Sequence, residues 1–69
     1  MTAPAAAALD PARRWGRVRE LREAFGFTKP WVFAALRDGR IRGKKVGGVL
    51  LIDLDSVRAL IDGAPDWTP

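Results

Sequence analysis

The 69-residue chain has no cysteine and no histidine. Without cysteine, no disulfide can brace the fold and no thiolate can bind a metal. Without histidine, the chain lacks the commonest general base, and a zinc site with nitrogen or sulfur ligands cannot form. The sequence therefore predicts neither a bound metal nor a cofactor, and no small-molecule ligand is evident from it.

Long hydrophobic runs are missing as well. The apolar stretch Ala5–Leu9 is far too short to cross a membrane, and no cationic residue precedes it as a signal peptide requires. We expect no membrane contact and a cytoplasmic location. A chain of this length has room for one domain with one small core.

The sequence gives little support for a catalytic pair of carboxylates. Glu20 and Glu23 fall on the surface of a predicted helix, and Asp53 and Asp55 fall where another helix begins. Solvation and capping account for these residues. We therefore expect that the chain is not an enzyme.

The chain does carry strong basic charge in its middle. Residues 13–45 hold eleven of the twelve Lys and Arg residues against three acidic ones, a net charge of +8. Residues 46–69 have a net charge of −3, with Arg58 against four aspartates. Such polarity is typical of a protein that turns one side toward a polyanion, although a well-solvated surface is the alternative.

Caps, breakers and apolar spacing divide the chain into a disordered arm (residues 1–12), one folded domain (13–63) and a short tail (64–69). Helices are predicted over about 18–25 and 29–38. A third helix begins at Asp53 or Asp55 and ends at Gly63.

The first two helices are separated by a tight connection. Gly26 ends the first helix, and Thr28 is placed to cap the second, where Pro30 is tolerated in the first turn. Two short helices joined by such a turn form a helix-turn-helix. On the second helix, Val32, Ala35 and Leu36 share the side that is expected to pack on the first.

Gly47-Gly48 lies between two β-prone runs and predicts a two-residue hairpin turn, since glycine adopts the positive φ of a type I′ turn. In this register Lys44 faces Leu51 on one side, and Lys45 faces Leu50 on the other. The expected fold is therefore α+β and mostly helical. It is a small winged helix-turn-helix with a two-stranded hairpin wing and a third, C-terminal helix.

One side of this hairpin is unusually apolar. If Leu50 and Ile52 face the core, the residues that point outward are Val46, Val49 and Leu51. They are a candidate contact for a neighbouring subunit. Alternatively the ends of the chain cover them, through Trp15 or Trp67.

In a helix-turn-helix the exposed side of the second helix lies in the major groove of DNA. Arg37 either pairs with guanine, contacts a phosphate or is a solvated charge, and Phe33 either touches a thymine methyl or, like Trp31, completes the core. The helix N-terminus favours phosphate. The candidate DNA-binding residues of this helix are Thr28, Lys29, Pro30, Phe33 and Arg37.

Four cations approach and enter the hairpin: Arg40, Arg42, Lys44 and Lys45. On a wing beside the recognition helix they would supply sequence-independent affinity for phosphate. If each neutralises one phosphate, log K falls against log salt with a slope of roughly −4.

The chain from Val18 to Ile61 resembles the excisionase-like winged-helix proteins, which are related to MerR-type DNA-binding domains. The resemblance covers about two-thirds of the chain. It lies in the helices of 18–26 and 27–36, the Arg37-Asp38-Gly39-Arg40-Ile41 stretch, the Val46-Gly47-Gly48 turn and Ile52–Val57.

The resemblance implies a protein that binds double-stranded DNA in the nucleoid of a bacterial host, often cooperatively at repeated sites. Lys29, Phe33, Arg37 and the wing cations would contact DNA. Where such proteins often carry Arg, this chain has Ala34 and the apolar strand Val49–Leu51, which shifts the expected wing contact to Lys44 and Lys45.

The implied role is that of a recombination directionality factor of a phage or integrated element, which bends or coats attachment-site DNA together with an integrase. A small transcriptional regulator of a mobile-element promoter is an alternative role for the same DNA-binding domain. A protein-protein adaptor, in which the cations are incidental, is an alternative of a different class.

Overall fold

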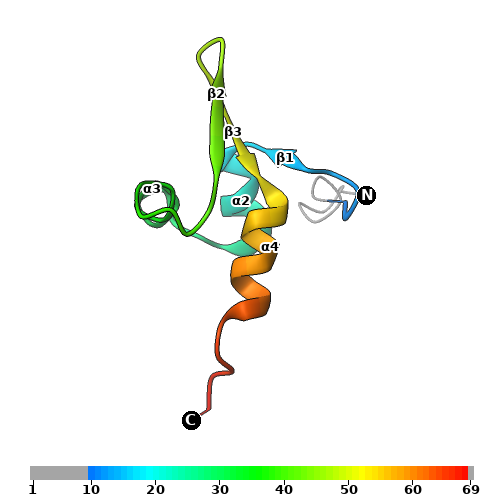
Figure 1. Cartoon of the computed structure of the whole chain (residues 1–69), viewed down its shortest axis with the longest axis vertical. Coiled ribbons are helices and arrows are strands. Elements are labelled where there is room, and N and C mark those ends of the chain that lie inside the picture. Colours follow the sequence, from blue (N-terminus) through cyan, green and yellow to red (C-terminus); the bar gives the residue numbers. More distant parts are fainter. Residues whose placement is uncertain (1–9, 69) are drawn as a thin grey trace.

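The structure, a computed structural model of the chain, describes residues 10–68. The elements in chain order are β1 (Trp15–Gly16), α2 (Val18–Phe25), α3 (Lys29–Arg37), β2 (Gly43–Val46), β3 (Val49–Asp53) and α4 (Leu54–Gly63) (Figure 1). About half of the described residues are helical, and the strands form one antiparallel sheet in the order β1-β3-β2. The expected α+β class is confirmed.

The predicted caps explain where α2 ends and where α3 begins. Gly26 follows α2 with φ 76°, a left-handed conformation that glycine adopts without steric cost. The Thr28 hydroxyl accepts a hydrogen bond from the Trp31 N–H at 3.2 Å and caps α3. α3 ends at Arg37, one residue earlier than predicted, because Asp38 serves as its C-cap.

The predicted two-stranded hairpin is confirmed, and a third strand that was not predicted joins it. The hairpin has the predicted register, with Lys44 opposite Leu51 and Lys45 opposite Leu50. In addition, the short strand β1 pairs Trp15 with Asp53 on the other edge of β3. A two-residue strand is too short to show apolar alternation in a sequence.

The core lies where α2, α3 and α4 meet the inner face of the sheet. Val32 and Ala35 are fully buried, as their spacing predicts, and Leu36 is half-buried against the same cluster. The fully buried apolar residues are Leu21, Val32, Ala35, Ile41, Ile52, Leu54 and Val57. No helix among residues 10–68 is both long and apolar enough to cross a bilayer.

The two ends of the described chain differ in how they are held. The Arg58 guanidinium of α4 donates hydrogen bonds to the backbone oxygens of Asp10 (3.1 Å) and Arg13 (3.0 Å), which fixes the approach to β1. The rest of the expected arm, residues 1–9, lies outside the described residues. At the other end Trp67 is 83% exposed, so it does not cover the hairpin.

Asp53 joins three elements at the end of β3. Its side chain is buried and accepts the Asp55 N–H at 3.0 Å, which caps α4. Its backbone N–H donates to the Arg42 oxygen at 2.8 Å. The carboxylate also lies 3.6 Å from the Arg14 guanidinium and 3.5 Å from that of Arg42. The residues before β1 and β2 therefore both meet the start of α4 at this one carboxylate.

The pKa of Asp53 reflects these partners. Burial alone would raise the pKa, but the hydrogen bond from Asp55 and the charges of Arg14 and Arg42 outweigh burial and hold the pKa below its ordinary value. The pKa of Glu20 is also lowered, because Arg13 donates to both of its carboxylate oxygens, at 2.6 and 3.1 Å. Both groups therefore stabilise the fold more in their charged forms than in their neutral forms.

Replacement of Asp53 separates its capping role from its charge. Asp53→Ala removes both and should lower the free energy of unfolding by about 1–2 kcal/mol, whereas Asp53→Asn retains a capping oxygen and should cost less. The unfolded pKa of Asp is about 3.9, so the charge stabilises the wild type above that pH and its contribution disappears as pH falls through the lower folded pKa.

Urea unfolding at pH 7 and at pH 3 measures both effects. The stability gap between wild type and Asp53→Asn should shrink at pH 3, while Glu20 contributes equally to both proteins. A gap that is constant with pH contradicts the lowered pKa of Asp53.

Candidate nucleic-acid interface

The face of α3 that points away from the core carries four of the nine residues predicted to bind DNA. Lys29, Pro30, Phe33 and Arg37 are all exposed, and Phe33 and Arg37 are one helical turn apart. Because the opposite side of the helix packs through Val32 and Ala35, this face is held at a fixed orientation. Phe33 is 40% exposed, which makes it a surface aromatic rather than a core residue.

At the N-terminus of α3, two cations lie close to Lys29 that the sequence analysis did not select. A shallow surface pocket is lined by Thr28 and Lys29 together with Arg19 and Arg22 of α2. Arg19 forms an ion pair with Glu23 at 3.6 Å, and both residues of the pair are largely exposed. The spacing of Arg19 and Arg22, three residues apart on one helix, was the available signal.

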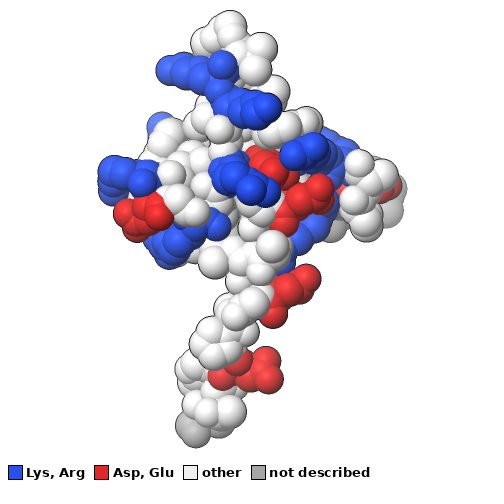
Figure 2. All heavy atoms as spheres, viewed as in Figure 1, with Lys and Arg blue, Asp and Glu red and all other residues white. Residues whose placement is uncertain are grey.

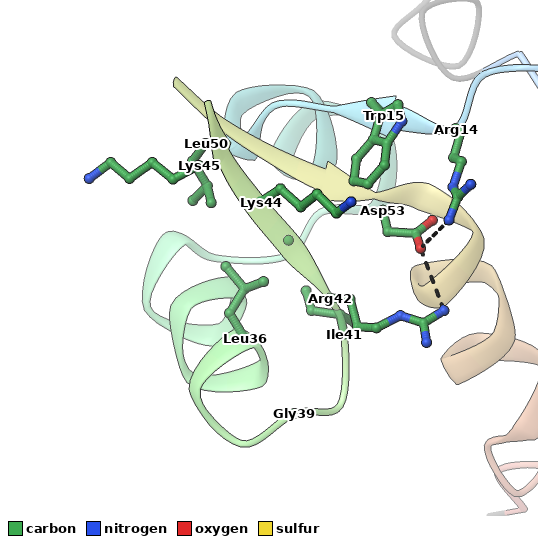
Figure 3. Close-up of a pocket in the computed structure, with 11 residues that line it drawn as sticks. Arg14, Trp15, Leu36, Gly39, Ile41, Arg42, Lys44, Lys45, Leu50 and Asp53 are labelled. Atoms are coloured by element: carbon green, nitrogen blue, oxygen red, sulfur yellow. Dashed lines mark ion pairs between the residues drawn. The ribbon is translucent and has the colours of Figure 1, made fainter. Parts of the chain in front are cut away.

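Lys45 lies on the sheet face that is turned toward α3. Strand alternation places it beside Leu50 and Gly43. A Cβ added at Gly43 would lie 3.0 Å from Leu36 Cδ2 of α3. An open pocket beside β2 is lined by Leu36, Leu50 and Lys45 and also by Lys44, Trp15 and Asp53 (Figure 3). The hairpin therefore approaches α3 closely at Gly43 and carries Lys45 on the same side.

Lys44 lies on the opposite face of the sheet. Its Nζ atom is 5.7 Å from the centroid of the Trp15 ring, and the Arg14 guanidinium is 5.1 Å from the same centroid. Figure 3 shows Lys44 extending toward Trp15 while Lys45 extends the other way. Arg42 is also directed to this side, where it pairs with Asp53. The two adjacent lysines thus extend to opposite faces of the sheet, and both line the open pocket.

Arg40 belongs to a third environment. It lies 3.4 Å from Asp38 and 5.4 Å from the centroid of the Trp31 ring. Trp31 itself is half-buried against the core and stacks on Phe27 at 4.0 Å. The structure thus separates the two aromatic residues of α3, since Trp31 packs inward and Phe33 faces out.

The predicted site residues therefore fall into groups. The structure brings Lys29, Pro30, Phe33 and Arg37 onto one face of α3, with Thr28 at its start and Lys45 on the adjoining side of the hairpin. We call this the α3 surface. Arg42 and Lys44 lie on the other side of the sheet, and Arg40 lies by Trp31. Of the apolar trio, Val46 is 58% exposed and Val49 and Leu51 are half-buried.

The chemistry available on the α3 surface is that of binding. Its ionisable groups are cations, and its apolar group is an exposed aromatic ring. Among residues 10–68 no cluster of three or more acidic, cysteine or histidine side chains could hold a metal ion. Such a surface can pair with anions and pack against flat apolar groups.

Comparisons with protein-family models, with curated proteins and with solved structures find no match to this chain.

The close approach of the β2–β3 hairpin to α3 can be tested at Gly43. In Gly43→Ala the new methyl group would lie 3.0 Å from Leu36 Cδ2 and 3.1 Å from the Leu51 backbone oxygen, which cannot readily move. We expect a loss of roughly 1–3 kcal/mol in unfolding free energy, as for other overpacked sites.

The control is Gly63→Ala at the end of α4, where a Cβ meets nothing within 4 Å. This variant should be neutral or slightly more stable, because alanine favours the helix. Equal stability of the two variants in thermal unfolding would contradict the tight contact at Gly43.

Proposed function

We propose that this protein binds double-stranded DNA, with α3 as the helix that lies in the major groove and the β2–β3 hairpin as a wing. The observation that carries the proposal is the α3 surface. A helix buried on one side presents Lys29, Phe33 and Arg37 on the other. An arginine can pair with guanine, and an exposed aromatic ring can pack against a thymine methyl.

The position of the wing supports the same proposal. Lys45 lies on the side of the hairpin that faces α3, so a duplex lying against α3 would place a phosphate strand near it. Arg19 and Arg22 flank the opposite end of the helix surface beside Lys29. Phosphate contacts at both ends of α3 would fix its register along the groove.

The biological role that we propose is of excisionase type, with an integrase as partner, and it rests on the sequence resemblance. The test is an excision assay with the integrase and attachment sites of the element that encodes this chain. Loss of excision without this protein supports a directionality role. Unchanged excision with altered promoter activity supports a transcriptional regulator.

Adjacent lysines offer a matched test of the DNA-binding surface. A duplex selected from a random pool is titrated with wild type, Lys45→Ala and Lys44→Ala at several salt concentrations. Lys45→Ala should weaken binding and reduce the slope of log K against log salt by about 0.9, the value of one phosphate contact. Lys44→Ala should bind nearly as wild type, because it lies on the other sheet face.

Two results would contradict this arrangement. A larger effect of Lys44→Ala than of Lys45→Ala would place the duplex on the face of the hairpin that is turned away from α3. Recovery of no duplex from the pool at low salt would exclude DNA binding altogether.

A further inference from the structure

Two exposed surfaces have no part in the proposed DNA contact. One is the sheet face that is turned away from α3. Strand alternation places Trp15, Lys44, Val46 and Leu51 on this face, and Arg14 and Arg42 lie at its edge. We call it the outer sheet face. The other is the C-terminal tail, residues 64–68, which follows α4.

The outer sheet face is both apolar and basic. Val46 is 58% exposed, and Val49 and Leu51 are half-buried. Arg14 and Arg42 share the single Asp53 carboxylate at 3.6 and 3.5 Å, yet their side chains are 60% and 75% exposed. Since each guanidinium has five N–H donors, both retain donors for a further anion.

The tail has the complementary character. Ala64 leaves α4 in an extended conformation, with φ −73° and ψ 146°. Trp67 is 83% exposed, and Ile61 at the end of α4 is 43% exposed. Asp62 and Asp66 lie between these two apolar residues in the sequence. Figure 2 shows acidic side chains along this end of the molecule and basic ones around the hairpin and sheet.

The tail is far from the outer sheet face of its own chain. Figure 1 places the C-terminal end and the hairpin tip at opposite ends of the molecule. The ten residues of α4 carry the tail about 15 Å away from the sheet. A tail that returned would have to reverse at once and extend fully along α4. The tail of a second copy can reach the outer sheet face without such a reversal.

We propose that the tail of one copy docks on the outer sheet face of another. Trp67 covers the apolar strip around Val46, and Asp62 and Asp66 face the cations Lys44 and Arg14. Tryptophan is a frequent anchor of interfaces because it buries a large rigid surface. The opposite charges orient the tail, and salt weakens their attraction.

The contact is heterologous, because the two partners use different surfaces. Each copy that has donated its tail still has an unoccupied sheet face, so assembly can continue in one direction. The α3 surface stays accessible in every copy. Self-association and DNA binding are therefore separable properties of the chain.

The first experiment measures sedimentation of the full chain without DNA at low ionic strength over a wide concentration range. The average mass should rise with concentration. Trp67→Ala and Lys44→Glu should each weaken self-association by about tenfold or more. Lys45→Glu is the matched control and should assemble as wild type does.

The second experiment mixes two disabled chains. Trp67→Ala has an intact sheet face but no anchor, and the double variant Lys44→Glu/Val46→Asp has an intact tail but no acceptor face. Both altered face residues are exposed, so the fold should persist. Each chain alone should remain monomeric, and the mixture should form a 1:1 dimer and nothing larger.

Several outcomes overturn the proposal: a wild type that stays monomeric at every concentration, a Trp67→Ala variant that assembles as strongly as the wild type, or a mixture that stays monomeric. Protection of Trp67 from a soluble quencher at all concentrations in the monomer would show that the tail docks within its own chain instead. Because DNA is absent, none of these results bears on the DNA-binding proposal.

Discussion

The arrangement of the sheet relative to α4 depends on Asp53. A buried carboxylate is costly unless it is fully partnered, and here the partners come from three places: the Asp55 N–H at the start of α4, Arg14 before β1 and Arg42 before β2. Ser56 adds a bridge, since its hydroxyl donates to the backbone oxygen of Asp53 and accepts the backbone N–H of Arg42. A domain this small has few core residues, so this polar junction sets the direction in which the hairpin leaves the body.

Local chemistry explains what the sequence predicted well. The end of α2 follows from Gly26, the start of α3 from Thr28, and the hairpin register from Gly47-Gly48, all of which act within a few residues. The strand β1 escaped prediction because its pairing with Asp53 joins residues far apart in the chain. The structural role of Arg58 was missed for the same reason, since it holds the backbone of Asp10 and Arg13.

The candidate site was predictable in part. Helical spacing was enough to place Lys29, Phe33 and Arg37 on one exposed face, because the buried residues of the same helix fix the opposite side. It could not tell which face of the hairpin is turned toward α3. That depends on the close approach of Leu36 to Gly43, a tertiary contact that sets which cations of the hairpin lie on the side of α3.

The two-residue turn at Gly47-Gly48 has a consequence for how such a chain can change. Side chains alternate along a strand, so inserting or deleting one residue between the turn and Arg42 exchanges the faces of the strand. The lysine that now lies beside α3 would move to the side of Trp15, while composition and net charge barely changed. The length of the hairpin therefore decides which lysine faces α3, and a comparison of residue types alone would not detect such a change.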